Sequence, residues 1–278
     1  MLYDVKAKIV KNQKLTPFIY YLELEMPKLT ALFVPGQFVH VRLLGTTDPL
    51  LRRPLSVNRI VNKKNAGIIY KIVGKGTYLL KEMAVGETVD VLGPLGNGFD
   101  LTKIKNSKGP VIFIAGGMGI APFLFLAKYL NKEKRKIIAF VGMETKAELV
   151  CVNELEKLNC DVKISTDDGS SGFKGYVSTC LEKYLEKRVA SSEKRVARDE
   201  KPYIYACGPK PMLKALRDLG EKYEIEGQVS LDEMMGCGLG ACLGCVVKTR
   251  NTADQGVVYK RICKDGPVFD IDEIIWEE

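Results

Sequence analysis

The 278-residue sequence predicts a multi-domain fold: an antiparallel β-barrel, an α/β domain with a parallel sheet, and a small cysteine-rich C-terminal domain. Three observations lead to this prediction. Residues 1–100 hold short strand-like runs between turn residues, residues 101–222 alternate apolar runs with helix-like segments, and residues 223–278 concentrate glycine and cysteine. At roughly 150 residues per domain, the length also favours more than one domain.

The strand-like runs of residues 1–100 are rich in valine, isoleucine, phenylalanine and tyrosine, and turn residues separate them. Several short strands with turn signals between them favour an antiparallel barrel or sandwich. In one run, Val39 and Val41 share a face while His40 lies on the other, so His40 is interpreted as a residue of the barrel face. The runs are VKAKIV, FIYYLEL, QFVHVRL, IIYKIV and ETVDVL.

Residues 101–222 change to a pattern of strand followed by helix. VIFIA is a continuous apolar run, a glycine turn follows it, and APFLFLAKYL then has helical spacing. KIIAFVGM and AELVCVNELEKL repeat the pattern, and DVKIST and PYIYACG add two strands. Strands that alternate with helices imply a parallel sheet. The run EKRVA occurs at 186–190 and again at 193–197, and its charges indicate a solvated helical extension.

Composition places the chain among ordinary globular proteins, with 46% hydrophobic and 27% charged residues. The net charge of +8 comes without a long basic run, so nucleic acid is not an expected partner. The single histidine, His40, excludes a zinc site built on several histidines. The uncharged stretch 109–127 is long enough for a membrane helix, but its glycines and prolines favour a strand, a turn and a buried helix.

Eight cysteines occur in a chain whose first residues show no secretory signal, which favours the reducing cytoplasm. Cys237, Cys242 and Cys245 are spaced C-x4-C-x2-C, and Cys263 follows them. This is the ligand spacing of a plant-type [2Fe–2S] cluster. Glycines between these cysteines let the backbone wrap a cluster and turn N–H groups toward its sulfurs. A zinc site with four cysteine ligands, or no metal at all, is the alternative.

Two glycine turns follow predicted strands of the α/β domain. Gly116, Gly117 and Gly119 lie in AGGMGIAP, where backbone amides and a helix N-terminus favour a pyrophosphate. An ordinary strand-to-helix loop is the alternative. ACGP at 206–209 ends another strand, at the edge where open α/β sheets bind ligands.

A further set of candidate binding residues lies in the predicted barrel. In RRPLS at 52–56, Arg53 can hold a phosphate through two guanidinium nitrogens, and Ser56 can offer its hydroxyl to a ring heteroatom. Gly76 and Thr77 precede YLLKEMA, a predicted short helix with Thr77 as its N-cap, and such a helix start favours an anion. Taken singly, none of these signals is specific.

Together these motifs resemble the ferredoxin-reductase family, whose flavin-binding barrel carries R-x-x-S and G-T and whose nucleotide domain carries GG-x-G-x-AP and C-G-P. The segments SLDEMMGCGLGACLGC and RICKDGPVFD resemble, more narrowly, the electron-transfer subunits of two-subunit, NAD-linked (class 1B) dihydroorotate dehydrogenases. The resemblance covers essentially the whole chain. It implies an FAD-binding barrel at 1–100, an NAD-binding α/β domain at 101–222 and a [2Fe–2S] domain at 223–278.

The resemblance implies a flavin site in the barrel. Leu55 stands where the wider family usually has a tyrosine against the flavin, so stacking must come from elsewhere. Lys71 stands where an arginine is common, and lysine keeps the charge but loses the fork geometry. The implied FAD residues are Arg53, Pro54, Leu55 and Ser56 around the flavin and phosphates, Tyr70, Lys71 and Ile72 lining the flavin, and Gly76 and Thr77 at the pyrophosphate.

The resemblance also implies the other two sites. Gly116, Gly117 and Gly119 would bind the NAD pyrophosphate, and Cys207, Gly208 and Pro209 would lie near the nicotinamide. Cys207 and Ser56 are the implied catalytic residues. Lys146 follows the second α/β strand without an arginine for a 2′-phosphate, which favours NAD and leaves NADP open. The ligands of one [2Fe–2S] cluster would be Cys237, Cys242, Cys245 and Cys263.

The implied function is that of an electron conduit in pyrimidine biosynthesis. NADH would give a hydride to FAD, the cluster would take single electrons, and an FMN-bearing catalytic subunit would interconvert dihydroorotate and orotate in a two-plus-two heterotetramer. Hydride transfer needs alignment more than acid–base residues. Apolar residues near the cysteines would face this partner or, alternatively, pack the small domain: Met234, Met235, Leu239, Leu243, Val268 and Phe269.

Three other functions stay open at this point. The same reductase could serve another partner, such as ferredoxin with NADP or a sulfur-reducing complex. It could be a free-standing NADH oxidase or dye reductase. The cysteines could instead hold zinc in a binding module without redox function. The segment RICKDGPVFD favours the dihydroorotate system.

Overall fold

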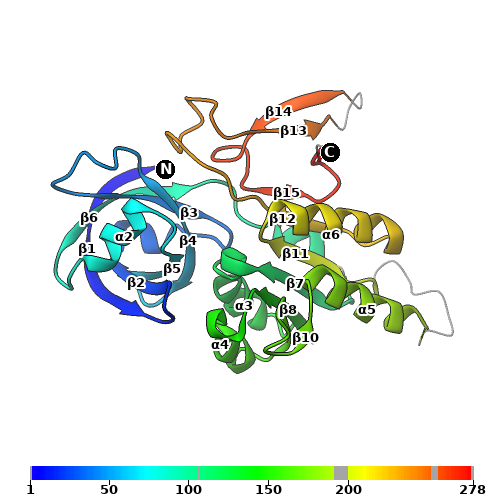
Figure 1. Ribbon diagram of the computed structural model, residues 1–278. Helices are drawn as coiled ribbons and strands as arrows, with labels where there is room; N and C mark the ends of the chain where they lie inside the picture. The colour runs from blue at the N-terminus through cyan, green and yellow to red at the C-terminus, as the bar shows by residue number, and fades with distance from the viewer. Residues whose placement is uncertain (1, 106, 191–199, 252–255, 277–278) are drawn as a thin grey trace.

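The computed structural model describes residues 2–105, 107–190, 200–251 and 256–276. Figure 1 shows the N-terminal barrel in blue and cyan, the α/β domain in green and yellow beside it, and the orange C-terminal segment at the top of the view. No helix in these ranges is long and apolar enough to cross a membrane. The uncharged stretch 109–127 forms a strand, a short 3-10 turn and the start of a helix, as predicted.

Six strands of the described chain close into an antiparallel barrel in the order β1-β2-β5-β4-β3-β6. The side chains of Val39, Val41 and Leu43 point into its aliphatic core, which confirms the predicted alternation in this run. Helix α1 (Pro27–Thr30) and helix α2 (Lys75–Glu82) lie in its connections. The strands are β1 (Tyr3–Lys14), β2 (Ile19–Glu25), β3 (Phe38–Leu43), β4 (Arg53–Ile60), β5 (Asn65–Lys71) and β6 (Thr88–Leu95).

Strand β4 was not among the predicted strands, although it carries the RRPLS motif. Pro54 near its start argues against a strand, because proline cannot donate to a β-ladder. The signal that remained was the alternation of Leu55 and Val57. Val57 lies in the barrel's apolar cluster and Leu55 packs against it. This burial stabilises β4 between β3 and β5.

The second sheet has the order β10-β9-β8-β7-β11-β12-β15. All its pairs are parallel except the last, in which β15 runs antiparallel to β12. The barrel and this parallel sheet confirm the predicted fold class. The strands are β7 (Val111–Gly116), β8 (Ile137–Met143), β9 (Cys160–Thr166), β10 (Phe173–Lys174), β11 (Tyr203–Cys207), β12 (Gly227–Ser230) and β15 (Val268–Asp270).

Helices cover this sheet, and one of them is shorter than its sequence pattern suggested. AELVCVNELEKL forms the 3-10 turn η3 (Lys146–Glu148) and then only α4 (Val152–Lys157), because Cys151 between them has φ 64°. The first EKRVA run ends α5, and the second lies outside the described residues. The remaining elements are η1 (Leu101–Ile104), η2 (Gly117–Ile120), α3 (Phe123–Asn131), α5 (Val177–Ala190) and α6 (Lys210–Tyr223).

The C-terminal segment does not fold on a core of its own. Strands β12 and β15 join the large sheet, and only β13 (Val246–Arg250) and β14 (Val257–Arg261) form a separate hairpin. Val229 and Phe269 pack in one cluster with Ile112 of β7. A segment of this length cannot bury a sufficient core alone, so it uses the sheet. The domain boundaries at 100/101 and 222/223 stay predictions.

Specific polar contacts join the parts. Asn58 of the barrel is fully buried and donates to the carbonyl oxygen of Ala121 at 2.7 Å. Lys71 of the barrel forms an ion pair with Glu148 of the α/β domain, with 2.9 Å between Nζ and Oε1. Asn97, after β6, donates from its side chain to the carbonyl of Asp265 at 3.0 Å. The barrel therefore contacts both the α/β domain and the cysteine-bearing segment.

Candidate functional site

Arg53 begins β4 and lies over the backbone of Gly76 in α2. A Cβ added at Gly76 would stand 2.7 Å from Nη2 of Arg53, so only glycine leaves room for the guanidinium. Burial lowers the pKa of Arg53, with the charge of Asp48 opposing. Among the described residues Arg53 makes no ion pair, and its head donates instead to the carbonyl of Leu51. A part-buried cation without a bound carboxylate suits a phosphate.

The start of α2 differs in detail from the sequence prediction. The helix begins at Lys75 with Gly74 as N-cap, so the prediction of Thr77 as N-cap is wrong. Thr77 lies one turn inside, and its hydroxyl accepts from the backbone N–H of Val73 at 3.0 Å and of Gly74 at 3.3 Å. The buried hydroxyl therefore fixes the turn from within. Gly76 and Thr77 still lie together with Arg53 at one site.

Strand β5, which carries Tyr70 and Lys71 and is followed by Ile72, lies next to β4, but the Tyr70 and Lys71 side chains have other partners. Tyr70 is only 2% exposed, and its hydroxyl donates to Oδ1 of Asn12 at 3.1 Å. Burial raises the pKa of this phenol. Lys71 holds Glu148 of the α/β domain. Tyr70 thus supports the barrel from inside, and Lys71 fixes the two domains to each other.

The two glycine turns of the α/β domain lie against each other. Strands β7 and β11 pair in parallel with Ala115 opposite Cys207, so both turns leave the same edge of the sheet. A Cβ at Gly119 would stand 2.7 Å from the backbone N of Gly208, and one at Gly208 would stand 3.0 Å from the N of Gly116. Backbone meets backbone here, which explains the need for glycine on both turns.

The positions of the other turn residues complete this site. Gly117 has φ 54° and open space around its Cβ position, which leaves room for a ligand. Pro209 is the N-cap of α6. Burial raises the pKa of the Cys207 thiol to about 12, with the charge of Asp232 adding to it. Cys207 is therefore a neutral thiol and not a nucleophilic thiolate at neutral pH.

Cys237, Cys242 and Cys245 of the C-x4-C-x2-C pattern, together with Cys263, form two thiol pairs. Cys237 lies within hydrogen-bond reach of Cys242, and Cys263 within reach of Cys245. Among the described residues, no three His, Cys, Asp or Glu side chains meet around a single point. Two pairs are what a two-iron cluster needs, because each iron takes two thiolates. The donor set therefore fits a [2Fe–2S] cluster.

Residues 231–245, here called the cysteine loop, contain no helix or strand. The backbone N–H of Leu239 donates to Sγ of Cys237 at 3.3 Å, and the N–H of Cys263 donates to Sγ of Cys245 at 3.4 Å. Burial alone would raise the pKa of Cys237, but the N–H groups of Leu239 and Cys242 outweigh it and lower the value to about 6. These N–H groups therefore favour the thiolate of Cys237, whereas burial and the neighbouring Cys245 raise the pKa of Cys263 to about 12.

Neighbouring residues hold the cysteine loop in shape. Gly238 and Gly240 have φ of 71° and 80°, in the left-handed region that glycine adopts without strain. Arg261 of β14 donates to the carbonyl of Gly240 at 3.1 Å while Asp265 holds its guanidinium at 2.9 Å. The loop is therefore fixed to the hairpin at one side.

His40 is a residue whose place the sequence did not reveal. It lies on the outer face of β3 as predicted, but it is fully buried, and neither ring nitrogen has a hydrogen-bond partner among the described residues. Its ring packs on the cysteine loop: a Cβ at Gly238 would stand 2.7 to 3.0 Å from three ring atoms. Burial, with the charge of Arg52, lowers its pKa to about 4. An unpaired buried polar group costs about 1–3 kcal/mol.

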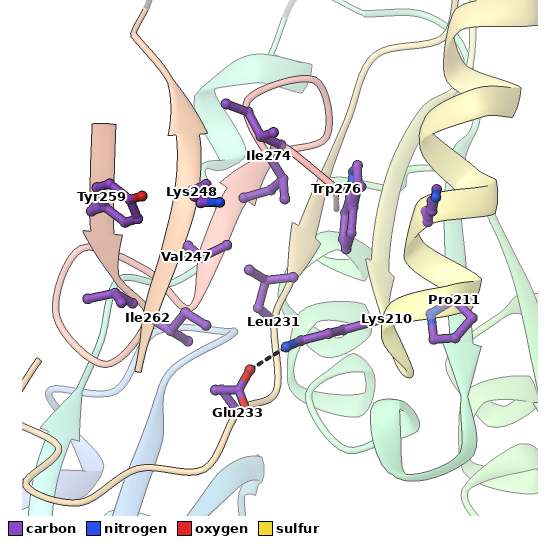
Figure 2. Close-up of a pocket in the computed structure, with 13 residues that line it drawn as sticks. Lys210, Pro211, Leu231, Glu233, Val247, Lys248, Tyr259, Ile262, Ile274 and Trp276 are labelled. Atoms are coloured by element: carbon purple, nitrogen blue, oxygen red, sulfur yellow. Dashed lines mark hydrogen bonds and ion pairs between the residues drawn. The ribbon is translucent and has the colours of Figure 1, made fainter. Parts of the chain in front are cut away.

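A cavity of about 480 Å³ lies between the start of α6 and the β13–β14 hairpin (Figure 2). Figure 2 shows Trp276, Tyr259 and Val247 around it, and Lys210 bound to Glu233 at its lower edge. None of the residues predicted to bind flavin, nucleotide or cluster lines it. The predicted sites are therefore formed elsewhere, at the barrel, at the sheet edge and in the cysteine loop.

The apolar residues around the cysteines divide into two groups. Met234 is 87% exposed and Leu243 is 60% exposed, and Leu239 is also exposed. Met235, Val268 and Phe269 are buried and belong to the two apolar clusters that include the sheet. Packing therefore accounts for the buried half of the set, and a partner-facing role for the exposed half stays a prediction. Cys242 of the same loop is also exposed.

Comparison with known proteins agrees with these sites. Residues 232–275 match the family described as the iron–sulfur cluster binding domain of dihydroorotate dehydrogenase B, and residues 113–218 match the oxidoreductase NAD-binding domain. The chain is 38% identical to the dihydroorotate dehydrogenase B (NAD(+)) electron transfer subunit of Desulforamulus reducens, over 98% of each chain. The corresponding subunit of Geobacillus kaustophilus is 41% identical over 87% of this chain and 86% of its own length.

Solved structures extend the comparison. A chain from the structure of an NADH-dependent reduced ferredoxin-NADP oxidoreductase, described in terms of flavin-based electron bifurcation, has a TM-score of 0.80 and 30% identity over 97% of this chain and 90% of its own. The ferredoxin-NADP+ reductase of Plasmodium falciparum has a TM-score of 0.64 and 20% identity over 81% and 96%, which shows the shared fold. These findings confirm the predicted cofactors FAD, [2Fe–2S] and NAD(H). The chain belongs to the electron-transfer subunits of NAD-linked dihydroorotate dehydrogenase B, oxidoreductase components built on the ferredoxin-reductase fold.

Proposed function

We propose that this chain passes electrons between NADH and an FMN-bearing catalytic subunit that interconverts dihydroorotate and orotate. The observation that carries the proposal is the pairing of four thiols, three from the cysteine loop and Cys263 from the turn after β14, at a site with one side against the barrel and the other at the surface. A group bound there can receive electrons from inside the molecule and give them up to a partner.

The FAD would bind along β4 and the start of α2. Arg53 supplies a cation without an ion pair in the described chain, and the turn at Gly74–Thr77 supplies backbone N–H groups. Pro54, Leu55 and Ser56 continue along β4, where Ser56 can hydrogen-bond to the ring system. Lys71 at the end of β5 and Ile72 directly after it would support the flavin from the next strand, with Tyr70 holding that strand from inside the barrel.

NADH would bind at the two facing turns, with Gly116, Gly117 and Gly119 at its pyrophosphate and Cys207, Gly208 and Pro209 at its nicotinamide. The neutral Cys207 thiol leaves that end uncharged. Beyond β8, the N–H of Asp168 donates to the carbonyl of Glu144 at 3.3 Å, which brings acidic residues beside Lys146. Carboxylates there favour the 2′-hydroxyl of NAD over the 2′-phosphate of NADP.

When bound, FAD and the cluster supply the change from the two-electron chemistry of NADH to single-electron transfer. The chain's own residues bind and orient these groups and exclude water from them. Arg53 and the α2 turn orient the flavin, the glycine turns orient the nucleotide, and the N–H groups of the cysteine loop stabilise thiolates. Proton transfer requires no side chain at this site, because hydride transfer depends on alignment.

The partner would dock on the exposed apolar group beside Cys242, formed by Met234, Leu239 and Leu243. Exposed apolar patches of this kind mark interaction sites. The name of the relatives implies a catalytic partner subunit, and we propose that it carries FMN and assembles as two copies of each subunit. A reducing cytoplasm would suit the four free thiols.

An anaerobic spectrum and a reconstitution assay test this function. The purified protein should show flavin and iron–sulfur absorption that NADH bleaches. Adding the FMN subunit should give NADH-dependent reduction of orotate. A colourless protein, or one that contains zinc in place of iron, would refute the electron-transfer role. A bleached protein that never reduces the FMN subunit would refute only the partner.

A second candidate partner is ferredoxin. It rests on the 30% identity to the NADH-dependent reduced ferredoxin-NADP oxidoreductase chain. In the same assay, reduction of ferredoxin at the expense of NADPH or NADH, together with no reduction of orotate, would favour this partner.

A further inference from the structure

His40 stands between two sites that the proposed function separates. It lies opposite Pro54 of the adjacent flavin strand β4. Its ring packs onto Gly238 of the cysteine loop, directly after the proposed ligand Cys237. No other histidine exists in the chain. The residue therefore connects the barrel to the cluster site through a single side chain.

The polar atoms of this ring require a partner. Both nitrogens are buried, and no described residue hydrogen-bonds to either. More than nine in ten buried polar groups in proteins have a hydrogen-bond partner. Phe38, with its ring centre 5.8 Å away, offers only an apolar face. No described side chain supplies this partner, and the ring adjoins the cysteine loop, where Cys237, Cys242 and Cys245 would hold the cluster together with Cys263.

The chemistry of the ring suits that partner. A neutral imidazole has one N–H donor and one acceptor nitrogen. Sulfurs of an iron–sulfur cluster accept hydrogen bonds, and the number of such bonds helps to set the cluster's reduction potential. Leu239 and Cys263 already direct N–H groups to cysteine sulfurs from the backbone.

We propose that His40 is a positioning residue that donates a hydrogen bond to a sulfur of the [2Fe–2S] cluster and thereby raises its reduction potential. This inference rests on the cluster of the proposed function. It adds a residue of β3, the strand that pairs with the flavin strand β4, to the cluster's surroundings.

Because the chain has one histidine, isotope labelling tests the contact in the unaltered protein. The cells receive histidine with ¹⁵N at both ring positions, and pulsed electron paramagnetic resonance is recorded on the reduced cluster. We expect an isotropic ¹⁵N coupling that is absent from the unlabelled protein. A reduced cluster whose signal shows no such coupling would overturn the inference while leaving the electron-transfer function intact. Wild-type protein without any cluster would overturn both.

Two variants test the effect on potential. His40→Leu should shift the one-electron reduction equilibrium of the cluster about tenfold toward the oxidised form, which corresponds to 59 mV. His40→Gln keeps an N–H donor and should stay near the wild-type potential. The flavin potential, followed in the same titration, should not change. Equal shifts in both variants, or a shift confined to the flavin, would show that His40 acts by packing or through the flavin, and would overturn the proposal.

Discussion

The barrel and the cysteine loop are stabilised in opposite ways. The barrel buries aliphatic side chains completely, including Ile9, Leu22 and Val39, inside regular strands. The cysteine loop has no regular element, exposes Met234 and Leu243, and holds Leu243 at φ 57°. Its ordered contacts run to sulfur and to Arg261. The barrel thus carries its own hydrophobic driving force, whereas the loop depends on what its thiols bind.

The largest expected effect is that of Cys242→Ser, which should remove the cluster and leave the flavin-binding barrel intact. The variant should lose the cluster and essentially all electron transfer to the partner, but keep FAD and NADH-to-dye activity, because the barrel does not need the loop. Iron content, flavin content and both activities are the measurements. Cys180→Ser, at a half-buried cysteine in α5, is the matched control and should change none of them. Full electron transfer to the partner in Cys242→Ser would show that the cysteine loop takes no part in that transfer.

The reverse experiment removes the flavin and keeps the cluster. Arg53→Ala should lose most of its FAD, because the other cation of the turn, Lys75, is paired with Asp48. Measurement of flavin and iron in the same sample checks this, with iron expected to be unchanged. Arg59→Ala serves as control, since Arg59 lies on the same strand but pairs with Glu154 at 3.3 Å. Undiminished FAD in Arg53→Ala would reject the assignment.

The two facing glycine turns of the α/β domain give a third case. Their shape depends on close contact between backbones, and not on a hydrophobic core or a metal. Gly119→Ala would push a Cβ into the backbone of the Cys207–Gly208 turn, so the KM for NADH should rise on the order of 10-fold to 100-fold. Gly117→Ala meets no atom of the chain within 4 Å, but its Cβ would enter the space proposed for the pyrophosphate, so it too should raise the KM, and it should cost about 1 kcal/mol of stability for its left-handed φ. Steady-state kinetics and thermal unfolding measure both effects in each variant. A wild-type KM in both variants would mean that the turns do not bind NADH.

The smallest expected effect concerns the stability of the barrel at acidic pH, which should not depend on the cluster. Burial opposes ionisation of Asp90, but a hydrogen bond that only a protonated Asp4 can donate, together with ion pairs to Arg52 and Arg42, outweighs it and holds its pKa at about 2. A depressed pKa contributes stability above the unfolded value near 4, and this contribution is lost as the pH falls toward 2.

Asp90→Asn should therefore lower the free energy of unfolding at pH 7 by roughly 2 kcal/mol and flatten its decline below pH 4. Urea unfolding at several pH values, followed by circular dichroism in the Cys242→Ser background, measures this without any contribution from cluster loss. The same slope in both proteins would assign the acid sensitivity to other groups.

The same contrast explains what could be predicted from the sequence. Alternation in QFVHVRL and the apolar run VIFIA predicted strands because burial follows a simple period there, and the cysteine spacing predicted the loop's ligand set. β4 was missed because Pro54 contradicts its alternation. The N-cap of α2 was misplaced because a threonine hydroxyl can fix a turn from inside it as well as from its first residue. The contacts of His40 with Gly238, and of Gly119 with the Cys207 turn, join residues far apart in the chain, so no local pattern contains them.

The antiparallel strand β15 has a consequence for exchanging parts between relatives. It adds the last strand to the large sheet, while the turn before it fits under the barrel at Gly96, where a Cβ would stand 2.9 Å from the carbonyl of Gly266. A graft of the cysteine-bearing segment from another family member must therefore match two host surfaces at once, the edge of β12 and the turn after β6. Functional chimaeras should require these two surfaces to be transferred with the segment, so the redox tail evolves together with its scaffold and not as an interchangeable cassette.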